Sequence, residues 1–468
     1  MTLSQIFKAY DVRATYPDKL NEPVAWRIGY AAGQHLGRAS GRAGGGTVLV
    51  GRDMRPHSPA LAASLIEGLR ASGVGVIDLG MCDTPFIYFA INHLDAAGGI
   101  QVTASHNPAN YNGFKISGRR AVPVGGDTGL RQIQTIAQSL GQHVGPDQLS
   151  AVGSLQEMDL WDEYRQHVLK FLTPPKRPIK VFIDASNGMA GKLVPKVFDG
   201  VKHLRIIPLN FEITGSFVHE PNPLVAENMQ PTQQGVVEHA ADLGVCFDGD
   251  ADRCIFCDDQ GRIIGCDHLT ALLTDHFVNG NPGTTIVYDL RSSKVVEETI
   301  RGHGAVPRMG RVGHVFMKAA LRETQGVFGG ELSGHFYFRD NFFADSGAIA
   351  FAAVLSVLGE SDKPVSELIA PFRKYPQSGE INFRVEDKAG VLQALKDRYA
   401  DANIDELDGV SIDKWDATSG GGGGFWLNVR PSNTEPLLRL NVEARDQATL
   451  EALLTEIKPM LGDEAVGH

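Results

Sequence analysis

The sequence predicts three similar α/β domains with mainly parallel mixed sheets, followed by a C-terminal α+β domain. One observation is a strand–helix–strand pattern that occurs three times, in which an apolar strand runs through a polar turn into a helix. A second is that this pattern stops after Pro364 and gives way to short strands that suit an antiparallel sheet with helices on one face. A third is the length of 468 residues, which is too long for a single hydrophobic core.

The three repeats follow from the positions of their apolar runs. In each repeat, the strand before the helix and the strand after it are expected to pair in parallel, as in a βαβ unit. The helices are expected at 58–72, 191–200 and 292–304, between strands at 47–53 and 73–80, 179–186 and 203–210, and 284–290 and 305–310.

Proline-rich and polar links divide these repeats into separate domains. One link is 171–178 and another is 358–367. We therefore predict three α/β domains and one α+β domain, at 1–150, 151–255, 256–365 and 366–468.

The composition argues against several classes of protein. The chain has 44 Lys and Arg against 55 Asp and Glu, a formal net charge of −11, and no long basic run, so a nucleic-acid partner is not expected. We find no apolar run long enough to span a bilayer and no signal-peptide pattern, so no membrane association is expected. Five cysteines in a chain of this size do not form a disulfide framework. We expect a cytoplasmic protein with reduced thiols.

Three aspartates at alternate positions, Asp248, Asp250 and Asp252, follow an apolar strand directly. Their carboxylates repel one another unless a cation is present, and Mg²⁺ is the usual cation where phosphate is handled. An EF-hand is excluded, because Arg253 and Asp259 stand where Gly and Glu are required. The alternative is a solvated acidic turn, but ligands of α/β proteins bind where buried strands end.

Ser105 lies in "TASHNP", on a turn that follows a short β-branched run. A serine in this place can be a nucleophile or only a loop hydroxyl. It is not the nucleophile of a G-x-S-x-G elbow, because Thr103 and Asn107 occupy the glycine positions. The residues themselves leave both roles open.

Two further loops carry groups that suit a sugar phosphate. Glu331, Ser333 and His335 alternate in a glycine-rich loop and could bind vicinal sugar hydroxyls, although a hydrogen-bonded turn is the simpler interpretation. The second loop could surround a phosphate, although its sequence is also good turn chemistry. It contains Arg430, Ser432, Asn433 and Thr434.

Three other patterns are not interpreted as sites. "SNGMAGKL" departs from a P-loop, because Ser186 replaces the first glycine and Leu193 the Mg²⁺-binding hydroxyl. Cys254 and Cys257 lie in a strand, where positions i and i+3 face opposite ways, so core packing is favoured over zinc. The run Gly420–Gly424 is not followed by a helix and predicts a mobile hairpin loop.

Together, "TASHNP", "DGDADR", "GELSGH" and "RPSNTEP" resemble, in this order, the motifs of the α-D-phosphohexomutase family, in particular its bacterial phosphomannomutase/phosphoglucomutase branch. The resemblance covers almost the entire chain. "FKAYDVR", with Tyr10 and Arg13, resembles the family's opening motif, and "NGFKI", with Lys115, the segment after its serine loop. Ala14 and Ala251 are small departures that do not touch the chemistry.

This resemblance implies that Ser105 carries a phosphoryl group. The serine would donate it to a hexose 1-phosphate, giving a hexose 1,6-bisphosphate that turns over in the site, and would take back the other phosphate. The resemblance further implies Mg²⁺ on Ser105 and the three aspartates, and glucose 1,6-bisphosphate as an activator. Lys115 would be the general acid/base, supported by His106.

The resemblance also implies four domains arranged around a central cleft, and a monomer whose partners are sugar phosphates. Arg253 would be a fixed cation beside the phosphoryl group. The remaining substrate-binding residues implied are Tyr10, Arg13, Arg291, His314, Glu331, Ser333, His335, Arg430, Ser432, Asn433 and Thr434.

Other functions remain as alternatives. An apolar strand followed by D-x-D also resembles phosphatases of the haloacid dehalogenase type, with Asp248 as the nucleophile. A phosphoglucosamine mutase and a non-catalytic sugar-phosphate-binding protein are further alternatives. No residue is clearly aimed at the sugar 2-hydroxyl, so the sequence does not choose between glucose and mannose.

Overall fold

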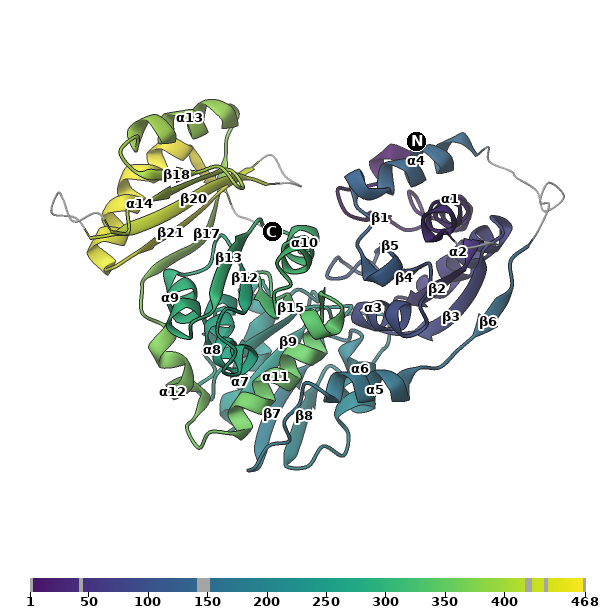
Figure 1. Cartoon of the computed structure of the whole chain (residues 1–468), viewed down its shortest axis with the longest axis horizontal. Coiled ribbons are helices and arrows are strands. Elements are labelled where there is room, and N and C mark those ends of the chain that lie inside the picture. The colour runs from purple at the N-terminus through teal and green to yellow at the C-terminus, as the bar shows by residue number, and fades with distance from the viewer. Residues whose placement is uncertain (1–2, 42–44, 141–151, 417–422, 433–436, 466–468) are drawn as a thin grey trace. The chain divides into compact units, whose positions relative to one another are not determined.

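The computed structural model describes residues 3–41, 45–140, 152–416, 423–432 and 437–465. The chain forms two compact units, and its path can be followed by colour in Figure 1. The first unit comprises Met1–Ile264, Leu321–Gly329 and Ser333–Ser366, and the second comprises Gly265–Ala320, Gly330–Leu332 and Glu367–His468.

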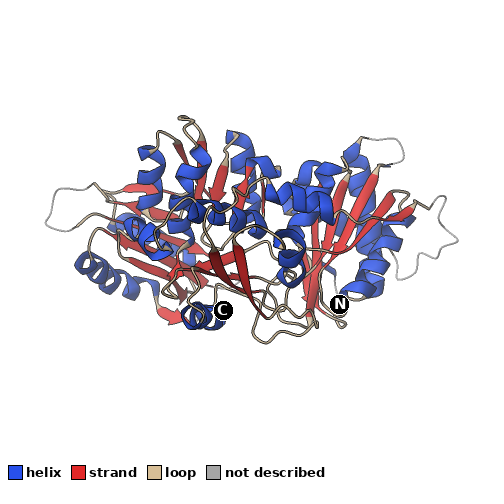
Figure 2. Cartoon of the chain, turned by 90° about the horizontal axis from the view of Figure 1, so that it is seen from below, coloured by secondary structure: helices blue, strands red, loops and turns tan. Residues whose placement is uncertain are grey.

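The first unit begins with a six-stranded sheet in the order β1-β5-β4-β2-β3-β6. Strand β2 pairs in parallel with β3 and β4, whereas β5 is antiparallel to β1 and β4. Figure 2 shows helices on both sides of this sheet. The elements are β1 Val12–Thr15, α1 Glu22–Ser40, β2 Thr47–Arg52, α2 Ser58–Ala71, β3 Gly75–Met81, α3 Thr84–His93, β4 Gly98–Val102, β5 Tyr111–Gly118, α4 Leu130–Ser139 and β6 Leu155–Glu157.

Helices α1 and α2 pack closely because glycines lie at their contact. A Cβ on Gly29 would lie 2.2 Å from the carbonyl oxygen of Leu65, and a Cβ on Gly68 would lie 2.0 Å from that of Trp26. Only residues without a side chain allow backbones this close. The pair covers a face of the sheet whose buried residues include Val48 and Ile100.

A second sheet of the first unit has the order β11-β10-β9-β7-β8. Strand β7 pairs in parallel with β8 and β9, and β10 returns antiparallel to β9. All five cysteines are buried and free, and two of them lie in β10. The elements are α5 Trp161–Leu169, β7 Ile179–Asp184, α6 Ala190–Phe198, β8 Leu204–Leu209, α7 Ala226–Glu238, β9 Leu243–Phe247, β10 Cys254–Cys257 and β11 Ile263–Ile264.

Helix α11 (Gly347–Gly359) belongs to the core of the second sheet although it comes much later in the chain. It is buried along almost its whole length and packs against α5, β7 and β10. Its Phe351 lies with its ring centroid 4.9 Å from that of Phe198 and 6.4 Å from that of Phe247. The neighbouring strands β15 (Phe336–Phe338) and β16 (Ala344–Asp345) are antiparallel.

The second unit contains the third repeat, in which β12 (Thr285–Asp289) pairs in parallel with β13 (Val306–Gly310) through α9 (Lys294–Gly302). All three predicted βαβ units are therefore confirmed. Other elements of this part of the chain are α8 Cys266–Val278, α10 His314–Thr324, β14 Phe328–Gly330 and α12 Val365–Ile369.

The second unit ends in an antiparallel sheet with the order β18-β19-β20-β21-β17-β22. Helices α13 and α14 share one core with it, as the predicted α+β arrangement requires. The predicted hairpin loop joins β19 to β20, but its glycines 420–422 lie outside the described residues. The elements are β17 Gln377–Arg384, α13 Lys388–Arg398, β18 Asn403–Asp405, β19 Val410–Asp413, β20 Phe425–Pro431, β21 Leu437–Ala444, α14 Gln447–Leu461 and β22 Asp463–Ala465.

Five short 3₁₀ helices complete the described structure, at Leu3–Gln5, Arg119–Ala121, Gly126–Thr128, Arg339–Asn341 and Ala370–Phe372. Over the described residues, no helix combines the length and the apolar character that crossing a membrane requires.

Candidate active site

Ser105 lies in a tight loop between β4 and β5, and we call residues 103–111, which include the first residue of β5, the serine loop. Its φ of +51° is unusual for a residue with a side chain, and such conformations persist where the surroundings fix them. Its backbone N–H donates to Thr103 Oγ1 at 2.9 Å, and its hydroxyl donates to Asp248 Oδ2 at 3.0 Å. His106 Nδ1 is 3.3 Å from the same hydroxyl. The loop thus presents a buried serine oxygen to the first of the three aspartates.

A buried arginine that sequence reasoning missed holds the serine loop in this shape. The Nε of Arg55 is 3.1 Å from Asp53 Oδ2, and the side chain is fully buried. Its two Nη atoms donate four hydrogen bonds of 2.6 to 3.0 Å to backbone carbonyls of the loop, those of Ser105, Asn107, Pro108 and Tyr111. One guanidinium therefore donates to four carbonyl groups of the loop at once and ties them to Asp53.

The three aspartates follow β9, and residues 248–253 are called the aspartate loop. Each carboxyl group is almost completely buried, and one oxygen from each lies within 4.8 Å of the others. Asp250 Oδ1 is buried and has no hydrogen-bond partner among the described residues. A hard divalent cation is the group that three convergent carboxylates with an unsatisfied buried oxygen fit.

Burial and the neighbouring carboxylates change the acidity of Asp248. Burial raises the pKa of Asp248 to about 7, with Arg253 opposing the rise and Asp252 and Asp250 adding to it. The guanidinium of Arg253 is close, with Nε 2.9 Å from Asp248 Oδ2. The cost of holding this charge away from water is thus only partly offset by the protein itself.

Lys115, on β5, reaches the aspartate loop from the other side. Its Nζ lies 2.7 Å from Asp250 Oδ2 and 2.5 Å from Asp252 Oδ2. Burial alone would lower the pKa of Lys115, but these two carboxylates outweigh it and raise the pKa above its ordinary value. Lys115 is therefore charged at neutral pH and can donate a proton.

His106 is neutral at the same pH. Burial lowers its pKa well below the ordinary value, and the positive charges of Arg253, Arg13 and Lys115 lower it further. A neutral imidazole beside the Ser105 hydroxyl can accept a hydrogen bond or a proton.

The serine loop and the aspartate loop together are called the serine–aspartate centre. Residues of the opening motif, and His335 of the loop predicted to bind sugar hydroxyls, also lie near this centre. Arg13 Nη1 donates to Asn107 Oδ1 at 2.6 Å in the serine loop, whereas Tyr10 is half-buried just before β1. His335 Nε2 is 3.5 Å from Asp252 Oδ1, and its Nδ1 is 2.9 Å from the hydroxyl of Ser333.

Two more residues of the first unit contact this centre and were not anticipated. Asp345 Oδ2 is 3.5 Å from His335 Nε2, so His335 lies between two carboxylates. Thr84 donates through its hydroxyl to Asp250 Oδ2, and its backbone N–H donates to the carbonyl of Asp250 at 3.1 Å.

In the second unit, the structure brings Arg291, Glu331 and Arg430 together. Arg291 is held by Asp289, with Nη2 2.6 Å from Oδ2, and the same Nη2 is 3.9 Å from Glu331 Oε1. Nη1 of Arg291 and Nη2 of Arg430 both contact Glu380 Oε2, at 3.2 and 2.8 Å.

For the other predicted residues of the second unit, the structure gives a chain position or a single backbone contact. Glu331 Oε1 accepts the backbone N–H of Gly313 at 3.1 Å, and His314 follows as the first residue of α10. Ser432 follows β20 directly, and its N–H donates to the carbonyl of Leu437 at 2.9 Å. Asn433 and Thr434 lie outside the described residues.

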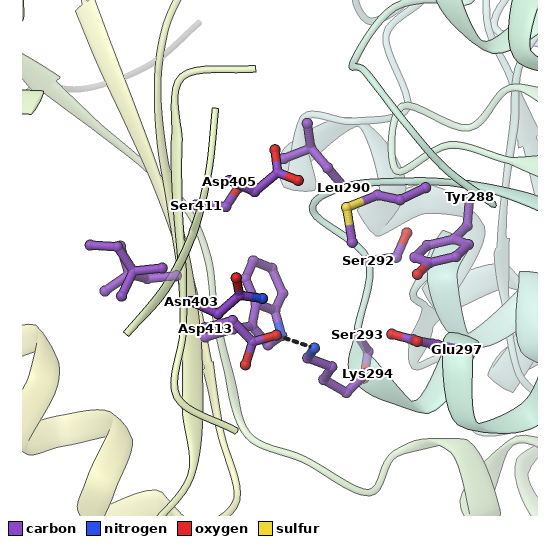
Figure 3. Close-up of a pocket in the computed structure, with 14 residues that line it drawn as sticks. Tyr288, Leu290, Ser292, Ser293, Lys294, Glu297, Asn403, Asp405, Ser411 and Asp413 are labelled. Carbon is purple, nitrogen blue, oxygen red and sulfur yellow. Dashed lines mark hydrogen bonds and ion pairs between the residues drawn. The ribbon is translucent and has the colours of Figure 1, made fainter. Parts of the chain in front are cut away.

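A separate pocket of the second unit contains none of the predicted site residues (Figure 3). It has a volume of about 110 Å³ and lies between residues of β12 and α9 and residues of β18 to β20. Lys294 forms an ion pair with Asp413 across it, and two further carboxylates, Glu297 and Asp405, line it. This excess of negative charge does not suit a phosphate.

Four family models match consecutive parts of the chain. The first is described as "Phosphoglucomutase/phosphomannomutase, alpha/beta/alpha domain I" and matches residues 4–143. Domain II of the same family matches 162–261, domain III matches 266–375, and the C-terminal domain matches 380–459. The chain belongs to the phosphoglucomutase/phosphomannomutase family.

Relatives of this phosphohexomutase match along its whole length. A "Phosphohexose mutases" protein of Xanthomonas campestris is 39% identical over 467 residues, which cover 97% of this chain and 98% of that protein. A "Phosphomannomutase" of Salmonella montevideo is 37% identical over 465 residues, with the same coverage. A solved phosphoglucomutase/phosphomannomutase family structure from Burkholderia thailandensis is 32% identical and superposes with a TM-score of 0.87 over 98% of both chains.

The chain is thus an isomerase of the mutase type, and the predicted fold class of three α/β domains and a C-terminal domain is confirmed. These matches give no support to the phosphatase alternative, in which Asp248 would be the nucleophile. The domain boundaries, the central cleft and the roles of the individual site residues stay predictions.

Sequence reasoning missed Arg55, Thr84, Asp345 and Glu380 in this phosphohexomutase. A signal existed for Arg55, because it comes just after the predicted strand 47–53, at the sheet edge where ligand-binding loops gather. Thr84, Asp345 and Glu380 stand in no motif, and only their contacts in the folded chain, with Asp250, His335 and Arg430, reveal them.

Proposed function

We propose that this chain reversibly interconverts hexose 1-phosphate and hexose 6-phosphate, of glucose, mannose or both, through a phosphoserine at Ser105 and a hexose 1,6-bisphosphate. The observation that carries this proposal is the Ser105 hydroxyl, buried 3.0 Å from Asp248 Oδ2 within a group of three carboxylates that fits a divalent cation. A serine that served only as a loop hydroxyl would not need such surroundings.

Asp248, Asp250 and Asp252, with Ser105, would hold Mg²⁺. When bound, this ion would offset the negative charge of the transferring phosphoryl group. Arg253 would add a fixed positive charge beside the serine, since its Nε is already 2.9 Å from Asp248 Oδ2. The transfer itself would then depend on positioning more than on covalent chemistry by the protein.

One proton must move in each transfer. When the phosphoryl group passes from Ser105 to a sugar hydroxyl, the bond between phosphorus and Oγ breaks, the sugar oxygen loses its proton, and the serine oxygen gains one. We assign the transfer to Lys115, which is held charged between Asp250 and Asp252: it would give a proton to the serine oxygen and take up the proton of the sugar hydroxyl. His106 would support the serine oxygen as a neutral hydrogen-bond partner 3.3 Å away.

The remaining predicted residues would bind the substrate. Glu331 and Ser333 would contact sugar hydroxyls, and the non-reacting phosphate would be held by Arg430, Ser432, Asn433 and Thr434. Tyr10, Arg13, Arg291, His314 and His335 would also contribute to substrate binding. Glucose 1,6-bisphosphate would act as an activator, because it returns a phosphoryl group to a Ser105 that has lost its own. We further propose that the enzyme works as a cytoplasmic monomer.

The proposal is tested by the mass of the purified protein and by replacing the serine. A fraction of the protein should be heavier by one phosphate, located on the peptide that contains Ser105 and stable to hydroxylamine, which would cleave an aspartyl phosphate. Ser105→Ala should lose at least about 10³-fold in mutase turnover, measured by coupled assays on glucose, mannose and glucosamine 1-phosphates. Ser139→Ala, an exposed serine on α4, is the matched control. Near-normal turnover of Ser105→Ala would exclude the mechanism.

A further inference from the structure

Glu380 lies among three arginines of the second unit, and the proposed function gives it no role. It belongs to β17, and its Oε2 contacts Nη2 of Arg430 at 2.8 Å and Nη1 of Arg291 at 3.2 Å. Its Oε1 is 2.8 Å from Nη1 of Arg439. Arg291, Arg430 and Arg439 are called the arginine cluster. A single carboxylate therefore bridges all three members.

Glu380 is a permanent anion in this place. Burial raises the pKa of a carboxyl group, but the charges of Arg291, Arg430 and Arg439 outweigh this effect and lower the pKa of Glu380 to about 2. Its side chain is still 25% exposed, whereas that of Arg430 is 4% exposed. The carboxylate is thus ionised at neutral pH and remains accessible from solvent.

The arginines have hydrogen-bonding capacity that this carboxylate does not use. Arg430 Nε is buried without a hydrogen-bond partner among the described residues. A guanidinium typically binds an oxyanion with two parallel N–H groups, whereas Arg430 gives Glu380 only Nη2. Arg291 would keep its orientation if Glu380 moved away, because Asp289 binds its Nε and Nη2.

We propose that Glu380 is a positioning residue that occupies the arginine cluster in place of the substrate's non-reacting phosphate and is displaced when that phosphate binds. This inference rests on the proposed function. A dianion with three free oxygens makes better use of the guanidiniums than one carboxylate does. The exchange also weakens the net hold on the phosphate, because the arginines recover an anionic partner each time the phosphate leaves.

This weakening suits a mutase. The bisphosphate must turn over between two transfers, so the group that holds its non-reacting end has to let go without a large free-energy cost. Without Glu380, the arginine cluster would bind phosphate more tightly and release it more slowly. Glu380 thus favours turnover over affinity.

The test compares phosphate binding by two variants of Glu380. Glu380→Gln keeps the size of the side chain and removes its charge, and we expect about tenfold tighter binding of mannose 1-phosphate and of inorganic phosphate. Calorimetric titration in a Ser105→Ala background measures this without turnover. Glu380→Asp keeps the charge but withdraws it by one bond, so its affinity should lie between that of the chain with its native Glu380 and that of the Glu380→Gln variant. Glu406→Gln, which removes an exposed glutamate paired with Lys396, is the matched control.

In the active enzyme, Glu380→Gln should lower both KM and kcat for mannose 1-phosphate, whereas a purely structural role would change stability alone. Unchanged or weaker phosphate binding by both variants would overturn the inference. If Glu380→Gln does not fold, as judged by thermal unfolding, the affinity of Glu380→Asp decides alone. Absence of mutase activity in the unmodified chain would instead refute the proposed function, and the binding comparison would still decide the role of Glu380.

Discussion

The serine–aspartate centre of the first unit and the arginine cluster of the second unit hold buried charge in opposite ways. In the first, the three carboxylates of the aspartate loop face two cations, Lys115 and Arg253, and Asp250 Oδ1 is left without a partner among the described residues. In the second, the cluster's guanidiniums share a carboxylate of the protein, that of Glu380.

The difference indicates how each centre binds its ligand. Buried charge that the protein does not compensate is costly, so the first centre is completed by adding a cation. The second is already compensated, so a phosphate enters it by exchange. Neutralising an aspartate of the first centre should therefore lower activity, because the cation loses a ligand. Neutralising Glu380 of the second centre should instead raise its affinity for phosphate.

After Ser105→Ala, the largest effect is expected at the aspartate loop. Asp250→Asn should weaken Mg²⁺ binding and slow turnover by roughly 10²- to 10³-fold, because the metal would lose a charged ligand. Stability without metal should change little, because the substitution also relieves repulsion among the carboxylates. Calorimetric titration with Mg²⁺ and turnover assays measure the two effects, with the exposed Asp340→Asn as the control. Full activity of the unmodified enzyme in excess chelator would contradict this interpretation of the loop.

The next effect is expected at Arg55, which shapes the first centre without touching substrate. Arg55→Ala should lower the free energy of unfolding by about 3–5 kcal/mol, because the buried Asp53 would lose its paired cation and four loop carbonyls would lose the hydrogen bonds of the guanidinium. Arg55→Lys keeps the charge but cannot span these carbonyls, so kcat should fall while KM stays near its normal value. Chemical denaturation and steady-state kinetics provide the measurements, and the exposed Arg38→Ala is the control. A kcat of Arg55→Lys equal to that of the unmodified enzyme would show that the loop keeps its shape without Arg55.

A smaller effect is expected at Arg430, in the direction opposite to that of Glu380→Gln. Arg430→Ala should raise KM for glucose and mannose 1-phosphates by similar factors of about tenfold, because the phosphate is common to both substrates. More bisphosphate should escape, so the variant should depend on added glucose 1,6-bisphosphate. Turnover with and without this activator measures the dependence. If KM and bisphosphate release are both unchanged, Arg430 does not hold the phosphate.

The smallest effect is expected at a charge pair that belongs to neither centre. His219 Nε2 is 3.0 Å from Asp184 Oδ2, and although burial lowers the pKa of His219, this carboxylate raises it above the ordinary value overall. A histidine with a raised pKa in the folded state stabilises the protein below its unfolded pKa of about 6.5, and this contribution is lost as the pH rises through the folded value. His219→Gln removes this contribution, so the free energy of unfolding should decline less steeply above about pH 6 in the variant. The difference should be less than about 1 kcal/mol, as measured by denaturation at several pH values.

Sequence reasoning predicted the parts of both centres that lie next to recognisable elements. The aspartates directly follow the buried strand β9 and Ser105 closely follows β4, so each could be expected at the end of a strand in its own sheet, where α/β proteins bind ligands. Arg55 and Glu380 act through partners 50 and 89 residues away, on Ser105 and Arg291. Such contacts depend on the fold as a whole: the position of Arg55 after a predicted strand indicates a ligand-binding edge but not its carbonyl partners, and no local pattern marks Glu380.

Helix α11 has a consequence for how the chain is made. The second sheet of the first unit is complete in sequence at Ile264, but the apolar helix that packs against β7 and β10 is synthesised only with Gly347–Gly359. A ribosome adds roughly 5–20 residues per second. The apolar face of the sheet that α11 covers is therefore exposed for several seconds before α11 is synthesised. We therefore expect the nascent chain to bind chaperones during this interval, and a fragment that ends at Ile264 to aggregate.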